Sequence, residues 1–333
     1  MKVVGFGDFL MHLSPIERMR FAQADTMRLS FTGAEANVLS ALGLWGVPTD
    51  FVTRIPRHAL SEKGVSFLKS LSVGTEHVAY GEGRMGVYFL ESGYSIRPSQ
   101  VIYDRMGTAF TESSFGDYDW EAILKDADVF CLGGITPSLS EELFACVKQV
   151  LAECKRRGIL VVFDVNLRPA ICGIERSREI FAALSPYIGC LISNEEHLKQ
   201  LLDVAVEKDP EDPARLPLLA DIARARTGIE RIAITVRRTP SASRAVVTAA
   251  YHDGRELAIG TTRTIDVVDR VGSGDAFTAG LVYSIIEESC ARDAVEFAIA
   301  SSAVKHTVYN DVNFATVHEI EALVKSTSCD VRR

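Results

Sequence analysis

Between residues 128 and 236, short apolar runs alternate with longer segments in which apolar residues recur every three or four positions. The short runs predict strands at 128–132, 160–164, 190–193 and 231–236. The longer segments predict helices at 140–157, 177–185, 194–202 and 216–227. This alternation is typical of βαβ units around a parallel sheet. Two further apolar helices, at 275–288 and 291–307, are expected to close the core.

The first third of the chain has a different pattern. Residues 27–31, 85–90 and 100–105 alternate apolar and polar positions, which predicts half-exposed antiparallel strands. We interpret them as a small β lid, built from segments of about 9–32 and 84–112, inserted into one domain that spans residues 1–333. Residues 206–217, rich in charge and proline, are expected to form a surface loop.

Composition excludes several classes of protein. With 47% hydrophobic and 24% charged residues, the chain is typical of a globular protein. A formal net charge of −8 argues against nucleic-acid or anionic-membrane binding, both of which need a basic surface. The sequence shows neither a signal peptide nor a long uncharged apolar run, so we expect a cytoplasmic protein without a membrane span.

The cysteines and histidines indicate no resident metal. Seven cysteines without a CxxC pair suggest reduced, buried thiols. Seven histidines show no spacing of the HExxH kind, so a built-in zinc site is not expected.

Candidate chemistry lies in residues 266–280, where an apolar run ends in a glycine turn and a helix follows. Backbone N–H groups of Gly272, Ser273 and Gly274, with the positive end of the helix, would form an anion site. Asp275 would then lie beside the anion. A carboxylate there is suited to take a proton from a hydroxyl that attacks a phosphate. The alternative is that Asp275 only caps the helix.

Residues 269–275, together with 32–37 (Thr-Gly-Ala-Glu-Ala-Asn), resemble the two signatures of ribokinase-like (PfkB-type) carbohydrate kinases. The resemblance covers nearly the whole chain. It implies an α/β fold, a ribokinase-like three-layer sandwich with a mostly parallel central sheet and a small inserted β lid. It also implies that Gly272, Ser273 and Gly274 bind ATP phosphates, that Asp275 is the catalytic base, and that Mg²⁺ arrives with ATP.

Three segments narrow the range of candidate substrates. Residues 84–89, 101–105 and 164–169 look most like those of 2-keto-3-deoxygluconate kinases. This similarity implies ATP-dependent phosphorylation of the sugar acid at its terminal hydroxyl, giving 2-keto-3-deoxy-6-phosphogluconate. Such a substrate carries a carboxylate and an oxo group, which need cationic donors.

Arg105 and Arg168 fit that need. Arg105 ends a lid strand with Tyr103 on the same face, because side chains alternate along a strand. Arg168 follows a core strand at the sheet edge where open α/β folds bind ligands, and it could serve the sugar, the ATP phosphates or both. The alternative is that each arginine is a surface ion-pair partner.

The resemblance also assigns the remaining contacts. Beside the two arginines and Tyr103, it places Gly33, Ala34, Asn37, Tyr88 and Asp311 at the sugar. It places Asn166, Arg168, Asn194 and Thr235 at the nucleotide, and Glu196 near the metal. For Gly33 and Ala34, tight helix packing is a second reading. For Tyr88 the alternative role is packing within the lid strand, and for Asp311 it is the formation of a turn.

The chain departs from the family pattern at several places, among them Thr32 for a glycine and Ser273 for an alanine. Val271 replaces a threonine, His197 stands where the Asn-x-x-Glu motif has its glutamate, and the basic segment 237–243 replaces a glycine-bearing loop. These departures leave two rival functions open. One is a kinase of a neutral sugar such as fructose, and the other is a non-catalytic sugar-acid sensor. An exposed apolar lid face suggests a homo-oligomer, and lid closure would exclude water from the site.

Overall fold

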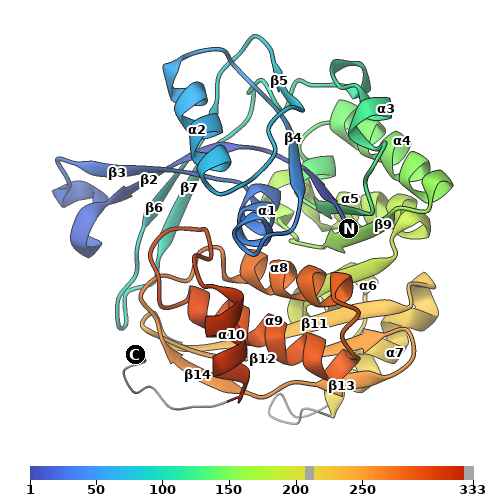
Figure 1. Cartoon of the computed structure of the whole chain (residues 1–333). Helices are drawn as coiled ribbons and strands as arrows, with labels where there is room; N and C mark the ends of the chain where they lie inside the picture. Colours follow the sequence, from blue (N-terminus) through green and yellow to red (C-terminus); the bar gives the residue numbers. More distant parts are fainter. Residues whose placement is uncertain (207–213, 326–333) are drawn as a thin grey trace.

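The computed structural model describes residues 1–206 and 214–325, which form a large and a small β-sheet with helices packed around the large one (Figure 1). The predicted fold class, an α/β sandwich with a mostly parallel sheet and a second small sheet, is confirmed. The predicted loop at 206–217 lies partly outside the described residues. Within it, helix α7 already begins at Arg215.

The large sheet has the strand order β13-β12-β11-β10-β9-β8-β1-β4-β5, with β14 paired to β12. From β5 to β11 neighbouring strands are parallel, and β12 pairs antiparallel with β11, β13 and β14. The strands are β1 (Val3–Phe6), β4 (Thr49–Ile55), β5 (Val78–Tyr80), β8 (Val129–Gly133), β9 (Leu160–Asp164), β10 (Cys190–Asn194), β11 (Arg231–Ser241), β12 (Arg244–Asp253), β13 (Leu257–Ile259) and β14 (Arg263–Asp266).

Two hydrophobic cores lie on opposite faces of this sheet because successive strand side chains point to opposite sides. Val3 belongs to one core and Val4 to the other, and along β8 Val129 and Phe130 divide in the same way. The first core packs α1 (Ala34–Leu44), α2 (Ala59–Ser70), α8 (Ser273–Ile286) and α9 (Ala291–Lys305). The second packs α3 (Trp120–Ile123), α4 (Glu141–Arg157), α5 (Pro169–Leu184), α6 (Glu195–Leu202) and α7 (Arg215–Thr227).

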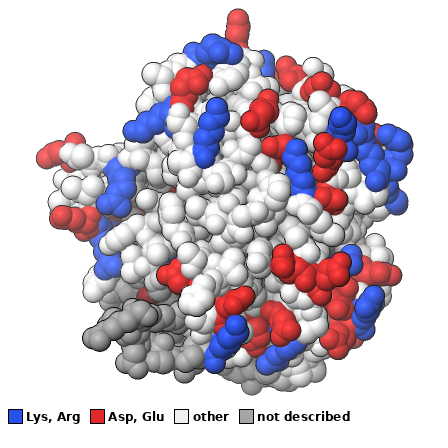
Figure 2. All heavy atoms as spheres, viewed as in Figure 1, with Lys and Arg blue, Asp and Glu red and all other residues white. Residues whose placement is uncertain are grey.

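Helix α10 (Val317–Lys325) packs on α9 near the described end of the chain. Short 3₁₀ turns occupy η1 (Ile16–Arg18), η2 (Phe21–Gln23), η3 (Phe115–Asp117), η4 (Thr136–Ser138) and η5 (Ser185–Tyr187). None of the helices in the described part of the chain combines the length and apolar character that a bilayer crossing requires. On the face shown in Figure 2, acidic and basic side chains are interspersed.

The small sheet has the order β3-β2-β6-β7 and projects from one side of the body (Figure 1). Its strands are β2 (Leu10–Pro15), β3 (Met27–Thr32), β6 (Gly86–Glu91) and β7 (Gln100–Asp104). All four lie within the two segments expected to form the lid. The pairs β2–β3 and β6–β7 are antiparallel as expected, but β2 and β6 pair in parallel.

Several boundaries differ from the sequence prediction. Helix α5 begins at Pro169, although the prediction began it at 177. The segment 237–243 is not a loop: β11 continues to Ser241 and turns directly into β12. The cysteines are free thiols as expected, but Cys290 is exposed and Cys172 only half-buried, so the prediction of buried thiols was wrong for these two. Cys329 lies outside the described residues.

Candidate active site

A cavity of about 770 Å³ lies between the small sheet and the carboxyl ends of the central strands. Asp164 ends β9, Asn194 ends β10 and Thr235 lies in β11, so this is the sheet edge where open α/β folds bind ligands. Every residue that the sequence singled out lines the cavity: Gly33, Ala34, Asn37, Tyr88, Tyr103, Arg105, Asn166, Arg168, Asn194, Glu196, Thr235, Gly272, Ser273, Gly274, Asp275 and Asp311.

The amino end of α8 forms the floor of the cavity. Gly272 caps the helix with a left-handed backbone (φ 75°), and a Cβ at this position would lie 1.8 Å from the carbonyl oxygen of Asp311. Only glycine fits there. At Gly274 an added Cβ would meet no atom within 4 Å. The first N–H groups of a helix have no intrahelical acceptor, so this end of α8 is suited to bind an anion.

Asp275 lies in the first turn of α8 and is not its cap, which is Gly272. The Asn37 amide donates from Nδ2 to Oδ2 of Asp275 at 2.7 Å, linking α1 to α8. Burial raises the pKa of Asp275 to about 8, with Asp164, Asp311 and Glu35 adding repulsion and the Asn37 hydrogen bond opposing it. A carboxylate with a raised pKa binds a proton readily, as a general base must.

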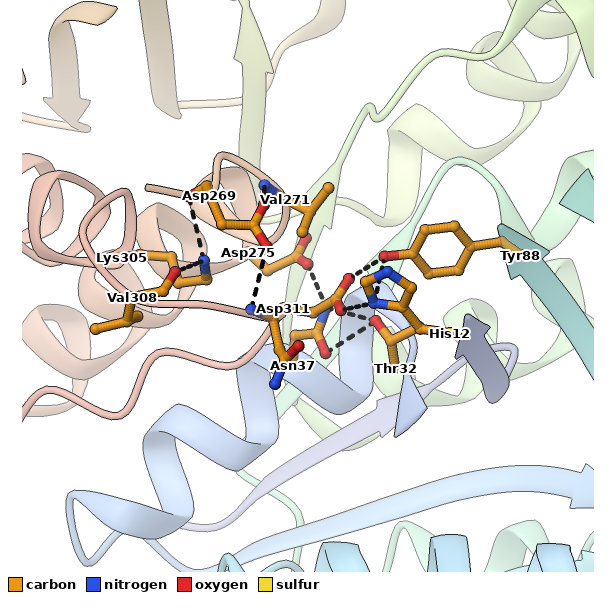
Figure 3. A network of polar contacts seen from close by, with 11 residues as sticks. His12, Thr32, Asn37, Tyr88, Asp269, Val271, Asp275, Lys305, Val308 and Asp311 are labelled. Atoms are coloured by element: carbon orange, nitrogen blue, oxygen red, sulfur yellow. Dashed lines mark hydrogen bonds and ion pairs between the residues drawn. The ribbon is translucent and has the colours of Figure 1, made fainter. Parts of the chain in front are cut away.

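Asp311 joins the body to the small sheet (Figure 3). The Tyr88 hydroxyl donates to Oδ1 at 2.6 Å, and Nδ1 of His12 lies 2.7 Å from Oδ2. The His12 and Tyr88 rings stack with their centroids 4.3 Å apart. Burial alone would raise the pKa of Asp311, but hydrogen bonds from His12, Tyr88 and Thr32 hold it below its usual range. Asp311 is therefore an ionised carboxylate at the lid junction, and Tyr88 does more than pack.

His12 was not found from the sequence. One signal was present: His12 is two residues from the buried Leu10 on β2, so both side chains point to the same inner face.

Arg105 follows β7 and is buried, with 8% of its surface exposed. Its Nε and Nη2 donate to Oδ2 of Asp8 at 3.2 and 3.1 Å, and its guanidinium lies 5.1 Å from the Tyr103 ring centroid. Arg105 thus forms an ion pair, but this ion pair is buried at the cavity wall and does not lie on the protein surface. Asp8, which the sequence did not single out, orients it.

A group of arginines lines the cavity next to the glycine turn: Arg168, Arg237, Arg238 and Arg270. Burial lowers the pKa of Arg237, and repulsion from Arg270 and Arg168 adds to the effect. Unlike Arg105, Arg168 makes no ion pair within 4.0 Å among the described residues, so it is not a surface ion-pair partner. Guanidinium groups gathered in this way are suited to bind a polyphosphate. Arg237 was not expected at the site, because a loop was predicted for its segment.

Asn194 and His197 form a local pair at the start of α6. The Asn194 side chain caps the helix by accepting from the His197 N–H at 2.8 Å, and its Nδ2 lies 2.8 Å from Nδ1 of His197. Burial lowers the pKa of His197 to about 4, with Arg168 and Arg237 contributing, so the ring is neutral at pH 7. The departure from the family motif therefore has a structural role.

Carboxylates at the nucleotide side of the cavity are few. The Glu196 side chain is 73% exposed and lies 3.5 Å from Lys199, whereas Glu195 forms a buried ion pair with Arg215. Asp164 also lines the cavity, and burial raises its pKa. Within residues 1–206 and 214–325, no cluster of three or more His, Cys, Asp or Glu side chains could hold a metal ion alone. This arrangement fits Mg²⁺, which proteins commonly bind through one or two carboxylates plus substrate phosphates.

Comparison with known proteins agrees with this geometry. The family model described as pfkB family carbohydrate kinase matches residues 1–318. The structure is similar to that of 2-dehydro-3-deoxygluconokinase from Thermotoga maritima, with 33% identity, a TM-score of 0.95, and coverage of 98% of this chain and 100% of that chain. The chain is also 26% identical, over 332 residues, to 2-dehydro-3-deoxygalactonokinase from Haloferax volcanii, covering 100% of this chain and 99% of the other.

A third relative is more distant. An E. coli protein solved in complex with ATP and Mg²⁺ is 19% identical, with a TM-score of 0.81 and coverage of 97% of this chain and 99% of that chain. At that identity it shows the shared fold.

Proposed function

This chain belongs to the pfkB family of carbohydrate kinases, and on that premise we propose that it transfers the γ-phosphoryl group of ATP to the terminal hydroxyl of 2-keto-3-deoxygluconate. The product would be 2-keto-3-deoxy-6-phosphogluconate. One observation carries the proposal: Asp275 at the amino end of α8 and the buried cation of Arg105 line the same cavity. The first serves phosphoryl transfer and the second serves an acidic substrate.

Asp275 would accept the proton of the attacking hydroxyl. Phosphoryl transfer requires in-line positioning and charge neutralisation more than covalent chemistry, so the protein's task is to orient the hydroxyl and to remove its proton. The Asn37 amide holds the Asp275 carboxylate through a 2.7 Å hydrogen bond and so fixes the base. The repulsion from Asp164, Asp311 and Glu35 favours proton uptake.

The phosphates would bind at the amino end of α8. Gly272, Ser273 and Gly274 line the cavity, and no Cβ at Gly274 obstructs the approach of an anion. Arg168 and Arg237 line the same cavity and would supply positive charge. Asn166, Asn194 and Thr235 line the same part of the cavity and are our proposed nucleotide contacts.

Mg²⁺ would be held by Asp164 and Glu196 together with the ATP phosphates, where it supplies charge neutralisation and orients the triphosphate. Asp164 is kept in place by two hydrogen bonds, from the Asn166 N–H at 3.1 Å and the Thr278 hydroxyl at 3.2 Å. This bonding makes Asp164 the more rigid of the two carboxylates.

The sugar acid would lie between α1 and the small sheet. Gly33, Ala34 and Asn37 would contact its hydroxyls, and Tyr88, Tyr103 and Asp311 would surround the chain of carbons. Arg105 and Arg168 would bind the carboxylate and the adjacent oxo group, since a guanidinium pairs with carboxylates through several donors. A guanidinium at the cavity wall suits an acidic substrate better than a neutral one, and this favours the sugar acid over the fructokinase alternative.

The test is an ADP-release assay with MgATP and a panel of sugars: 2-keto-3-deoxygluconate, its galacto epimer, gluconate, fructose and ribose. We expect selective turnover of the keto-deoxy acids, with ³¹P NMR showing the phosphate on the terminal carbon. The Asp275→Asn variant is the matched control for contaminating kinases. Preferential turnover of fructose or ribose would refute the proposed substrate class while leaving the kinase activity intact.

A further inference from the structure

Lys305, the last residue of α9, is fully buried, with none of its surface exposed. A buried ammonium ordinarily requires a carboxylate partner. No ion pair of Lys305 within 4.0 Å occurs among the described residues. Instead its Nζ donates to two backbone carbonyls, that of Val308 at 3.2 Å and that of Asp269 at 3.5 Å (Figure 3).

The two carbonyls belong to the loops that build the phosphate side of the cavity. Asp269 precedes the glycine turn at 272–274, and Val308 precedes Asp311. The same loops are joined by further contacts: the Asp269 carboxylate accepts from the N–H groups of Val271 and Asn310, at 3.2 and 3.1 Å. The N–H groups of Val268 and Asp269 donate to the carbonyl of His306.

The contact between the loops is also steric. Gly272 packs so tightly on Asp311 that no side chain fits at 272. A change in the distance between the two loops would therefore move the cap of α8 and, with it, the N–H groups expected to bind phosphate.

We propose that Lys305 is a positioning residue whose ammonium, held by backbone carbonyls of both loops, acts as a built-in monovalent cation that sets the geometry of the phosphate-binding turn. The inference rests on the proposed role of Gly272, Ser273 and Gly274 in binding ATP phosphates. It has a direct consequence. Since the cation is covalently part of the chain, phosphate binding and turnover do not depend on any free monovalent ion.

The charge of Lys305 also interacts with the carboxylates around it. Burial lowers the pKa of Lys305, and the carboxylates of Asp269, Asp311 and Asp275 oppose that fall and favour the ammonium form. Burial raises the pKa of Asp269, and Lys305 opposes that rise. Removal of the ammonium would take away the cation that offsets the charge of Asp269, next to the site where the negatively charged triphosphate is expected.

The first experiment needs no variant. The purified protein is transferred to buffers in which the only monovalent cation is tetramethylammonium, Na⁺, K⁺ or NH₄⁺, at constant ionic strength. Turnover with the keto-deoxy acid and calorimetric binding of Mg·AMP-PNP are measured in each. We expect both to agree within about twofold across the four cations. Activation by K⁺ or NH₄⁺ several-fold above tetramethylammonium would overturn the proposal.

The second experiment removes the ammonium. Lys305→Met keeps the length of the side chain and its apolar contacts, whereas Lys305→Ala leaves a space near the two carbonyls. Lys325→Ala on α10, where the side chain is 73% exposed, is the matched control. Hydrogen bonds from charged groups are worth enough to predict a loss of about 10- to 100-fold in kcat for both Lys305 variants and none for the control.

Chemical rescue separates positioning from general loss of structure. We expect NH₄⁺ or K⁺ to restore turnover of Lys305→Ala in a saturable way, and not that of Lys305→Met, in which the space is filled. Rescue of Lys305→Ala by tetramethylammonium to the same extent would contradict the proposal, as would wild-type kcat in Lys305→Met. Binding of Mg·AMP-PNP is measured in parallel. If the wild-type protein binds the nucleotide but phosphorylates no sugar, the proposed function is refuted, and nucleotide binding by the variants still tests the role of Lys305.

Discussion

Among single residues, Asp275, our proposed catalytic base, lies in an environment that disfavours its charged form. Its Oδ2 is bonded to Asn37, and burial raises its pKa to about 8. A proton acceptor contributes about 10²- to 10⁴-fold to the rate, so we predict that Asp275→Asn lowers kcat by that factor and leaves Mg·AMP-PNP binding within a few-fold of wild type. ADP release and calorimetry measure the two quantities.

The same substitution, Asp275→Asn, should lower kcat without lowering the stability of the folded protein at high pH. A carboxyl group whose pKa is raised on folding contributes stability below its unfolded pKa of about 4, and this contribution is lost as the pH rises through about 8. The asparagine amide of Asp275→Asn does not titrate, so the variant avoids that loss of stability. The thermal midpoint of Asp275→Asn should therefore be at least that of the wild type at pH 9. A fall in the midpoint together with a fall in kcat would show that Asp275 is structural.

The pH dependence of turnover gives an independent prediction. Asp275 can accept a proton only when ionised, so kcat/KM for the sugar acid should rise with pH up to about 8 and then level off. Glu35, whose pKa burial raises to about 7, is another buried carboxyl group that titrates in this range.

The control for the pH profile is Glu35→Gln, because the glutamine oxygen can still accept the Gly133 N–H now bonded to Oε1 of Glu35 at 2.7 Å. If Asp275 determines the profile, the variant keeps the inflection near pH 8. A profile that is flat between pH 6 and 9 in the wild type would exclude Asp275 as the titrating base.

Sequence reasoning located the residues that lie in a recognisable motif and missed those that reach the site from elsewhere. Asp275 and Gly272 were found because glycine turns before helices have a known chemical use. Arg237 was missed because its segment was expected to be a loop. His12 and Asp8 were missed because their partners are distant in sequence, 299 residues away for His12 and Asp311 and 97 for Asp8 and Arg105. Only the tertiary fold brings such pairs together.

Among the elements, the hairpin of β11 and β12 changes which residues we expect to contact the nucleotide. Segment 237–243 was expected to be a loop because it replaces a glycine-bearing one and contains Pro240. The structure continues the strand because Arg237 and Arg238 pair antiparallel with Val247 and Val246, and the irregularity after Arg238 accommodates the proline. The extended strand carries Arg237 to the cavity.

We therefore predict that Arg237→Gln raises the KM for ATP about tenfold or more, with a much smaller effect on the KM for the sugar acid, since a guanidinium bonded to phosphate is worth roughly 1.5–3 kcal/mol. Arg244→Gln is the matched control. Arg244 lies on the same hairpin, but its side chain is 60% exposed and does not line the cavity. Equal KM values for ATP in the two variants would remove Arg237 from the nucleotide site.

At the scale of the whole molecule, β4 and β5 were not among the predicted strands, but β8 to β11 of the same parallel sheet could be predicted because they are apolar and alternate with helical segments. The antiparallel edge formed by β12, β13 and β14 could not. Arg244–Asp253 mixes small, polar and charged residues, and only pairing with β11 makes it a strand. The order of the strands likewise depends on which helix crosses which face.

The small sheet supports the last prediction. β7 pairs with β6 on one edge only, and all five of its residues are exposed. Val101 and Tyr103 line the cavity, so the alternate residue Ile102 points to the other face, where it is 54% exposed. Ile96, 96% exposed, and Met106, 59% exposed, are further uncovered apolar residues near this strand in the sequence. An open, apolar edge strand of this kind is a ready surface for a second copy of the chain.

We expect a homo-oligomer joined through the small sheet, and Ile102→Asp should shift its molar mass toward that of the monomer in light scattering coupled to size exclusion. Leu60→Asp, an exposed apolar position on α2 (43% exposed), is the control and should not change the mass. Because Tyr103 and Arg105 lie on and just after the same strand, loss of the oligomer should also raise the KM for the sugar acid more than that for ATP. A wild-type protein that is monomeric at micromolar concentration would refute the interface, and a dimer unaffected by Ile102→Asp would move it to another surface.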